Sequence, residues 1–239
     1  MKKILLYSGG VDSWLINQIW KPDIKLYVNL GTSDSEEEMT LFKKNNEDVN
    51  VINFNLSEWE LSNKIIPLRN LYLILLACNF SLFEDVEICL GATVGDRNHD
   101  KTLEFFNKSE ELLNYIYSEK ADYHPNRKIK LNTSFKNKSK TDLLKMYLKQ
   151  GGDINKAYNE THGAYKENMS LWQLKKFYKK FMCFKLNGYV FPAHIERRMY
   201  HYFKNNKLKE TLALTNERGH EKEEMLKVFY MLENVYGNE

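Results

Sequence analysis

The chain has few cysteines, and none of them stands in a pair that would hold a metal ion or a disulfide framework. Its three cysteines are Cys78, Cys89 and Cys183, which lie far apart without a Cys-x-x-Cys pair. This spacing excludes a disulfide framework and argues against a standard cysteine zinc site. Only four prolines and eleven glycines interrupt the 239 residues. We therefore expect helices to dominate the second half of the chain.

Long apolar runs are also missing. The longest candidate, residues 71–83, is interrupted by Asn79 and falls short of the roughly 18 residues that a membrane span needs. The N-terminus starts like a signal peptide, but its apolar stretch of four residues ends at Ser8. We therefore expect a cytoplasmic protein with no membrane partner.

No strong net charge marks the chain for a particular partner. Lysine and arginine number 35 against 32 for aspartate and glutamate, and this net charge of +3 does not by itself predict nucleic-acid binding. A basic segment around Arg197 and Arg198 is a candidate for such binding, but a solvated amphipathic helix is the favoured interpretation. Apolar residues make up 43%, which suffices for a core and excludes disorder along the whole chain.

Short apolar runs alternate with helical patterns over the first ninety residues. We expect strands at 3–7, 24–29, 49–54 and 86–91, and helices at 11–20, 33–44 and 67–83. This order is typical of a parallel sheet that is covered by helices. The fold class predicted here is therefore α/β, a parallel twisted sheet with helices on both faces.

The pattern becomes more helical after Gly91. We expect one more strand at 128–132 and six helices, at 102–119, 139–150, 171–184, 194–204, 207–216 and 221–236. Gly151 and Gly152 form a strong signal for the end of the second of these helices. The expected organisation is a nucleotide-binding α/β domain at 1–152 and a helical C-terminal lobe at 153–239.

One glycine-rich string follows an expected strand and opens an expected helix. We call it the 8–13 loop, and its residues are Ser8, Gly9, Gly10, Val11, Asp12 and Ser13. The N–H groups and dipole of a helix start attract anions, and glycines let the backbone approach a phosphate closely. Asp12 is placed to hold a metal-bridged pyrophosphate. A tight turn capped by Asp12 or Ser13 is the alternative. No Gly-Lys-[Ser/Thr] follows, so the string is not a Walker A loop.

This string is similar to the signature of the PP-loop ATP pyrophosphatases, the adenine nucleotide α-hydrolase-like superfamily. The resemblance implies ATP and magnesium as cofactors, with Asp12 as a catalytic residue and a magnesium ligand. It also implies that the 8–13 loop and Gly31 bind the nucleotide. In that superfamily an acceptor oxygen attacks the α-phosphate and releases pyrophosphate, and a nitrogen or sulfur nucleophile then displaces AMP.

Further segments resemble 7-cyano-7-deazaguanine synthase, which makes preQ0 in queuosine biosynthesis. Arg69 and Asn70 close a Pro-Leu-Arg-Asn string like that family's Pro-x-Arg-Asn helix start. Gly91 closes an Ile-Cys-Leu-Gly string like its Ile-x-x-Gly segment, and Asp96 and Asp100 lie downstream. The resemblance implies a catalytic role for Arg69 and substrate contacts for Asn70, Gly91, Asp96 and Asp100. The structural alternatives are an ion pair, a helix cap and a solvated loop.

Two other segments match motifs of this family in their position along the chain. Lys140, in a Ser-Lys-Thr-Asp string, occupies the position of the lysine in Thr-Lys-x-Glu. The resemblance implies that Lys140 neutralises charge on the phosphates, and the alternative is an ordinary surface lysine. Residues 158–165 loosely follow the family's Tyr-x-x-Thr-Trp-Ser-Cys-Tyr stretch, with Thr161 and Tyr165 as the matches.

The chain departs from this family at the cysteines that bind its structural zinc. Ala164 stands at the first cysteine position, and residues 167–180 contain no cysteine. Cys183 alone cannot form a tetrahedral site, and His194 and His201 lack a third ligand nearby. We therefore expect no zinc. Helix packing is expected to replace it, through three aromatic residues: Trp172, Phe177 and Phe181.

These features together predict an ATP-dependent adenylating enzyme, a ligase that forms C–N bonds. By resemblance its substrates are a small acid, such as a 7-deazaguanine carboxylate, and ammonia, and its product is an amide or a nitrile. One alternative keeps this chemistry but modifies a protein or nucleic-acid group. Another is a nucleotide-binding partner protein that has lost turnover. The oligomeric state is not predicted.

Overall fold

The computed structural model describes residues 1–62, 65–94, 99–118, 126–207 and 219–237, and the chain divides into two compact units. Met1–Lys138 forms the N-terminal unit and Ser139–Glu239 forms the C-terminal unit. The division expected at 152/153 differs from this one by a single helix, since α5 (Lys140–Lys149) falls in the C-terminal unit.

The N-terminal unit is built on a five-stranded parallel sheet. Its strands are β1 (Lys2–Leu6), β2 (Ile24–Asn29), β3 (Asn50–Asn53), β4 (Val86–Cys89) and β5 (Ile129–Leu131). They lie in the order β3-β2-β1-β4-β5, and each neighbouring pair is parallel. The parallel sheet predicted from the alternating pattern is confirmed.

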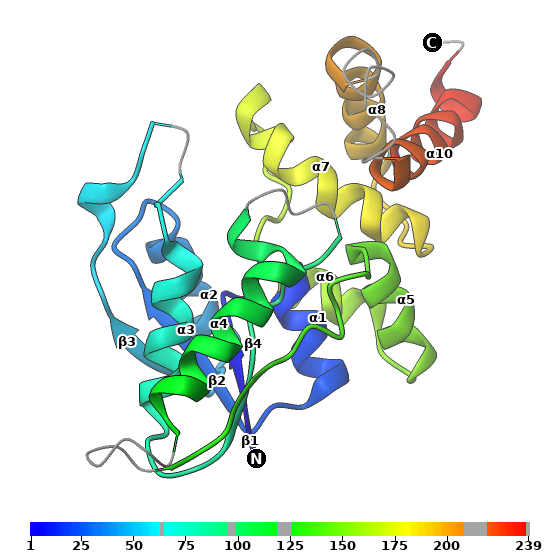
Figure 1. The fold of residues 1–239 in the computed structure, drawn as a ribbon. Coiled ribbons are helices and arrows are strands. Elements are labelled where there is room, and N and C mark those ends of the chain that lie inside the picture. The colour runs from blue at the N-terminus through cyan, green and yellow to red at the C-terminus, as the bar shows by residue number, and fades with distance from the viewer. Residues whose placement is uncertain (63–64, 95–98, 119–125, 208–218, 238–239) are drawn as a thin grey trace. The chain divides into compact units, whose positions relative to one another are not determined.

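Helices pack on this sheet, as Figure 1 shows. They are α1 (Val11–Trp20), α2 (Ser35–Lys44), α3 (Arg69–Phe80) and α4 (Leu103–Ile116). The chain moves outward from β1 to β3 through α1 and α2, and then crosses back to β4 and β5 through α3 and α4. Because crossovers between parallel strands are right-handed, the two pairs of helices cover opposite faces.

The side chains of β1 and β2 follow this division. Ile4 and Leu6 belong to the buried cluster that includes Ile74 of α3. The intervening positions point to the other face, where the rings of Tyr7 and Tyr27 lie 5.6 and 5.1 Å from the ring of Phe42 on α2. Alternation along a strand therefore buries both faces of the sheet.

The strand order reverses between β1 and β4, which is where open parallel sheets bind ligands beyond their carboxyl ends. The register pairs Leu6 with Leu26 and Leu5 with Cys89. The segments that follow β1, β2 and β4 consequently leave the sheet side by side. We call this side of the N-terminal unit the carboxyl edge.

The C-terminal unit is helical, as predicted. It contains α5, α6 (Ile154–Glu160), α7 (Leu171–Leu186), α8 (Ala193–Tyr202), a π-helical turn (Phe203–Lys207) and α10 (Gly219–Tyr236). Helix α7 packs against α5, α8 and α10. Phe177 and Phe181 are buried in this unit, as expected. Most of the helix predicted at 207–216 falls outside the described residues, within which no helix has the length and apolar character of a membrane span.

Candidate functional site

The 8–13 loop joins β1 to α1 at the carboxyl edge, and its backbone requires glycine at one position. Gly9 has a φ of +70°, in the left-handed region that glycine adopts without strain. A Cβ atom there would lie 3.0 Å from side-chain atoms of both Leu41 and Phe42. Helix α2 therefore fits closely against the loop, which leaves no room for a side chain at Gly9.

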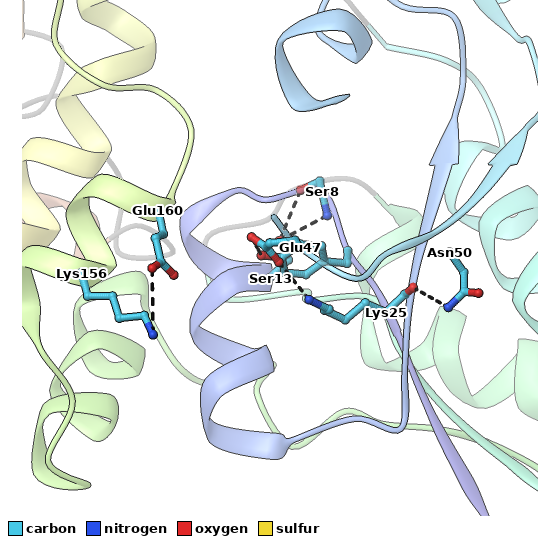
Figure 2. A network of polar contacts seen from close by, with 8 residues as sticks. Ser8, Ser13, Lys25, Glu47, Asn50, Lys156 and Glu160 are labelled. Carbon is cyan, nitrogen blue, oxygen red and sulfur yellow. Dashed lines mark hydrogen bonds and ion pairs between the residues drawn. The ribbon is translucent and has the colours of Figure 1, made fainter. Parts of the chain in front are cut away.

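Two hydroxyl groups hold the loop in shape (Figure 2). Ser13 donates to the carbonyl oxygen of Gly10 at 3.2 Å and accepts from the Ser8 N–H at 3.3 Å. The Ser8 hydroxyl lies 3.4 Å from the Ser13 hydroxyl and accepts from the Gly10 N–H at 3.4 Å. The two serines thus bridge the turn internally.

Helix α1 begins without a side-chain cap. Gly10 is its N-cap residue, in an extended conformation, and no side chain accepts a cap hydrogen bond there. The alternative in which Asp12 or Ser13 caps the turn is therefore wrong, because both lie inside the helix. The N–H groups of an uncapped first turn, with the helix dipole behind them, form an anion-binding arrangement.

Glycines with positive φ also follow the neighbouring strands. Gly31, after β2, has a φ of +71°, and Gly91, after β4, has a φ of +67°. The Gly31 N–H donates to Asn29 Oδ1 at 3.0 Å, and a Cβ atom on Gly31 would lie 2.4 Å from Asn55 Oδ1. A glycine with positive φ therefore follows each of three adjacent strands, β2, β1 and β4, so the main chain at the carboxyl edge is not covered by a Cβ atom at these positions.

Helix α3 begins at Arg69, after a strained residue. Leu68, its N-cap residue, has a φ of +59°, which costs a non-glycine residue roughly 1–2 kcal/mol. This left-handed turn explains why the helix starts two residues later than predicted, beyond Pro67. It also means that Asn70 lies inside the helix and does not cap it.

The structure brings two predicted substrate residues together. Asn70 is only 3% exposed, and its amide donates to the carbonyl oxygen of Asp100 at 3.3 Å. Asp100 lies in a short 3-10 helix, His99–Lys101, and its Oδ1 atom is buried with no hydrogen-bond partner among the described residues. Asp96, the other predicted acid, lies outside the described residues.

Glu38 on α2 is a titratable group that sequence reasoning missed. Its carboxylate accepts a hydrogen bond of 2.8 Å from the Tyr27 hydroxyl. Burial raises the pKa of Glu38 to about 7, Asp34 raises it as well, and the nearby charge of Arg69 lowers it. Arg69 therefore lies within electrostatic reach of α2. In the sequence only the helical spacing of Glu38 to Phe42 could have indicated that this acid faces inward.

We expect the stability of the protein to fall as pH rises from about 4.5 to about 7, because folded Glu38 retains a proton that the unfolded chain releases. The loss in the free energy of unfolding is complete above pH 7 and is on the order of 2–3 kcal/mol. Glu38→Gln should remove this part of the pH dependence, and Glu36→Gln, an exposed acid in the first turn of α2, should not. Denaturant unfolding at several pH values between 5 and 8 measures the free energy of unfolding. If this free energy changes with pH equally in the parent protein and both variants, the prediction is wrong.

Lys140 belongs to the C-terminal unit, whereas Asp12 and Arg69 belong to the N-terminal unit. It is the first residue of α5, directly after the N-cap Ser139. The Ser139 hydroxyl accepts from the Asp142 N–H at 3.0 Å, and the Asp142 carboxylate accepts from the Ser139 N–H at 2.9 Å. This capping box defines the helix start that was predicted from the Ser-Lys-Thr-Asp string.

The segment 158–169, where zinc cysteines would be expected from the resemblance, is held by two cations on neighbouring helices. The buried ammonium of Lys180 donates to the carbonyl oxygens of Tyr158 and Thr161, at 2.9 and 2.8 Å. Arg198 donates to the Tyr165 hydroxyl at 2.9 Å and to the carbonyl oxygen of Met169. Within the part of the chain that the structure describes, no three His, Cys, Asp or Glu side chains gather as a metal site.

Purified protein is expected to contain no stoichiometric zinc, because Ala164 is exposed at the first cysteine position and Cys183 is buried on α7. Elemental analysis of protein purified without chelators measures this directly. About one zinc per chain would contradict the expectation and would mean that histidines and carboxylates supply the ligands.

Magnesium is a different case, since it needs few protein ligands. It usually binds one or two carboxylates together with the phosphates of a nucleotide. Asp12, in the first turn of α1, is the one carboxylate of the 8–13 loop. This donor set fits a magnesium ion that arrives with ATP.

Comparisons of the chain with protein-family models, with curated proteins and with solved structures find no match. The five-stranded parallel sheet in the order 3-2-1-4-5 is consistent with Rossmann-like and nucleotide α-hydrolase-like folds.

Proposed function

We propose that the chain is an ATP-dependent adenylating enzyme of the PP-loop type, which releases AMP and pyrophosphate. The observation that carries this proposal is the uncapped, glycine-rich start of α1 at the point where the strand order reverses. A phosphate there would meet main-chain N–H groups and the positive end of a helix dipole. No lysine of the Walker type stands in the loop, which argues against γ-phosphoryl transfer.

The residues of the carboxyl edge receive distinct roles. In this proposal the 8–13 loop binds the phosphates, Gly31 binds the adenosine through its main chain, and Asp12 holds magnesium. Bound magnesium would neutralise negative charge on the phosphates. Arg69 would stabilise the charge that develops as the α–β bond breaks. The protein's contribution is thus positioning and electrostatic stabilisation.

The acceptor in this proposal is a small carboxylic acid, and ammonia is the nucleophile. The carboxylate oxygen attacks the α-phosphorus and pyrophosphate leaves. Ammonia then attacks the acyl carbon, loses a proton and displaces AMP, which gives an amide. A nitrile would require a second ATP that adenylates the amide oxygen, so that this oxygen leaves with AMP and the nitrogen loses its two protons. Asn70, Gly91 and Asp100 are assigned to the acceptor, since they lie at the carboxyl edge. Three further assignments rest on resemblance alone. They are a 7-deazaguanine carboxylate as the acceptor, Asp96 as a further contact to it, and Lys140 as a contact to the phosphates.

Calorimetry of ATP binding in the presence of magnesium tests the site itself. Gly10 has φ −69° and ψ 162°, which any residue can adopt, so Gly10→Val should preserve the fold while obstructing the phosphates. We expect at least a tenfold loss of ATP affinity, about 1.4 kcal/mol. Asp12→Asn should weaken magnesium-dependent turnover more than stability.

The matched control is Gly219→Ala at the start of α10 in the C-terminal unit, where a Cβ atom meets nothing within 4 Å and the backbone is not in the left-handed region. This substitution should leave ATP affinity unchanged. If Gly10→Val also binds ATP as the parent protein does, the nucleotide site lies elsewhere and the proposal fails.

A further inference from the structure

Positive charge is concentrated in the C-terminal unit. Residues 139–239 contain 18 lysines and arginines against 12 aspartates and glutamates, a net charge of +6. Residues 1–138 contain 17 against 20, a net charge of −3. The net charge of +3 for the whole chain is therefore the small sum of two opposite charges. A division of this kind indicates that the basic part of a protein has a polyanionic partner.

Helices α7 and α8 contain a single acid between them. Helix α7 has five lysines and no aspartate or glutamate, and α8 has one glutamate, Glu196. Glu196 is only 8% exposed, forms an ion pair with Lys185 of α7 and accepts a hydrogen bond of 3.4 Å from the Tyr236 hydroxyl. The one negative charge of these two helices is therefore compensated inside the unit and does not offset the basic residues on the outside of α8.

The outer side of α8 carries a row of basic residues, which we call the basic ridge. Its members are His194, Arg197, His201 and Lys204. All four are exposed, and Lys204 stands in the π-helical turn that continues α8. Their spacing of three or four residues puts them on one side of the helix. At 1.5 Å per residue the ridge is about 15 Å long.

Aromatic rings hold two of these cations in place. The Arg197 guanidinium lies 5.7 Å from the ring centre of Tyr236, and the Lys204 ammonium donates to the Tyr200 hydroxyl at 3.0 Å. Both rings are buried. The hydrogen bond to Tyr200 raises the pKa of Lys204, and the charge of Glu233 raises it as well. A cation that is already held in place loses less conformational entropy when it binds a ligand.

We propose that the basic ridge binds the phosphate backbone of a nucleic acid. The phosphates of one strand follow one another at about 3.4 Å along the axis, so a ridge of about 15 Å spans roughly four of them. Such contacts release counterions and do not depend on base sequence. Helix α8 is thus the solvated amphipathic helix that the sequence favours, with a ligand for its exposed side. The inference is independent of the proposed ATP chemistry, since it uses residues of the C-terminal unit alone.

An anionic membrane is the other polyanion that a basic helix can bind. A helix of that kind inserts exposed aromatic or large aliphatic side chains into the lipid beside its cations. The large apolar side chains of α8 are Ile195, Met199, Tyr200 and Tyr202, and all of them are buried. Helix α8 therefore fits a nucleic acid better than a lipid surface.

Fluorescence anisotropy with the full chain tests this inference. The probes are labelled single-stranded RNA, single-stranded DNA and duplex DNA of about 20 nucleotides, titrated at several salt concentrations. The double variant Arg197→Gln with Lys204→Gln should lower the slope of log K against log salt by about 1.4–1.8, which is a roughly 25- to 60-fold loss of affinity at 0.1 M salt. Arg197→Lys with Lys204→Arg should bind as the parent protein does. The matched control is Lys43→Gln with Lys44→Gln, which removes the same charge from two exposed lysines of α2 and should change neither quantity.

The single variant Lys204→Gln replaces the double variant if the latter does not fold, and about half of the change in slope is then expected. Equal binding by the ridge variant and the parent protein overturns the inference, and so does an equal loss in the control or no binding of any nucleic acid to the parent. Phosphatidylserine vesicles are the remaining probe. If the parent binds these vesicles but no nucleic acid, the ridge is a membrane contact and the inference is wrong.

ATP titrations of the same proteins keep this inference apart from the proposed function. The ridge variants should bind ATP as the parent protein does. If nucleic acid binds through the ridge but ATP does not bind, the proposed function fails while the assignment of the ridge stands.

Discussion

Replacing Arg69 with alanine is expected to lower turnover by roughly 30- to 1000-fold while ATP affinity changes little. One charge-assisted contact to a developing charge contributes about 2–4 kcal/mol to the transition state. A contact that is made mainly in the transition state affects kcat more than binding. Lys140→Ala is expected to behave in the same way, from the role that the resemblance implies for this lysine.

The measurement is chromatography of labelled ATP incubated with magnesium, ammonium and 7-carboxy-7-deazaguanine or another candidate acid. AMP and pyrophosphate are the expected products. Lys108→Ala is a suitable control, since this lysine pairs with Glu104 on the exposed side of α4. ADP and phosphate as the main products would overturn the mechanism. No hydrolysis with any acid, protein or nucleic-acid acceptor would favour the nucleotide-binding partner protein.

The variant Arg69→Ala can also be tested without substrate, through the pKa of Glu38. The charge of Arg69 lowers the pKa of Glu38, against the larger effect of burial. Removing the guanidinium should therefore raise the pKa of Glu38 further and shift the pH-dependent loss of stability to higher pH. The double variant Arg69→Ala with Glu38→Gln should show no such shift.

Replacing Lys180 with methionine is expected to lower the stability of the C-terminal unit by about 2–4 kcal/mol. The side chain is 4% exposed, and its ammonium donates to carbonyl oxygens of three residues: Tyr158, Thr161 and His162. Methionine keeps much of the side-chain volume but leaves these buried acceptors without their donor. The segment between α6 and α7 loses its attachment to α7 as a result.

Urea unfolding measures this loss as a lower midpoint with an unchanged slope. Lys179→Met is the matched control, because the neighbouring lysine on α7 is largely exposed and lies 3.8 Å from its partner Glu221. A surface pair of this kind contributes at most about 1 kcal/mol. Equal urea midpoints for Lys180→Met and Lys179→Met would show that the buried ammonium of Lys180 does not stabilise the segment between α6 and α7.

Much of the N-terminal unit follows from short stretches of sequence. Helix α1 and strand β2 have the bounds 11–20 and 24–29 that the sequence predicts, since each is a continuous pattern between turn signals. The 8–13 loop is recognisable for the same reason, because its two serine hydroxyls form hydrogen bonds within five positions. The helix predicted at 67–83 is shorter in the structure, and α6 was not predicted at all.

The sequence by itself determined the parallel sheet, the helical C-terminal unit and the glycine turn at the start of α1, because these depend on local propensity and periodicity. Only the tertiary structure placed Gly91 beside the loop, buried the carboxylate of Glu38 near Arg69 and set the ammonium of Lys180 among carbonyl oxygens. It also buried Glu196 and left the basic ridge of α8 exposed. Burial and electrostatic fields arise between groups that are distant in the chain, and no local pattern encodes which groups will meet.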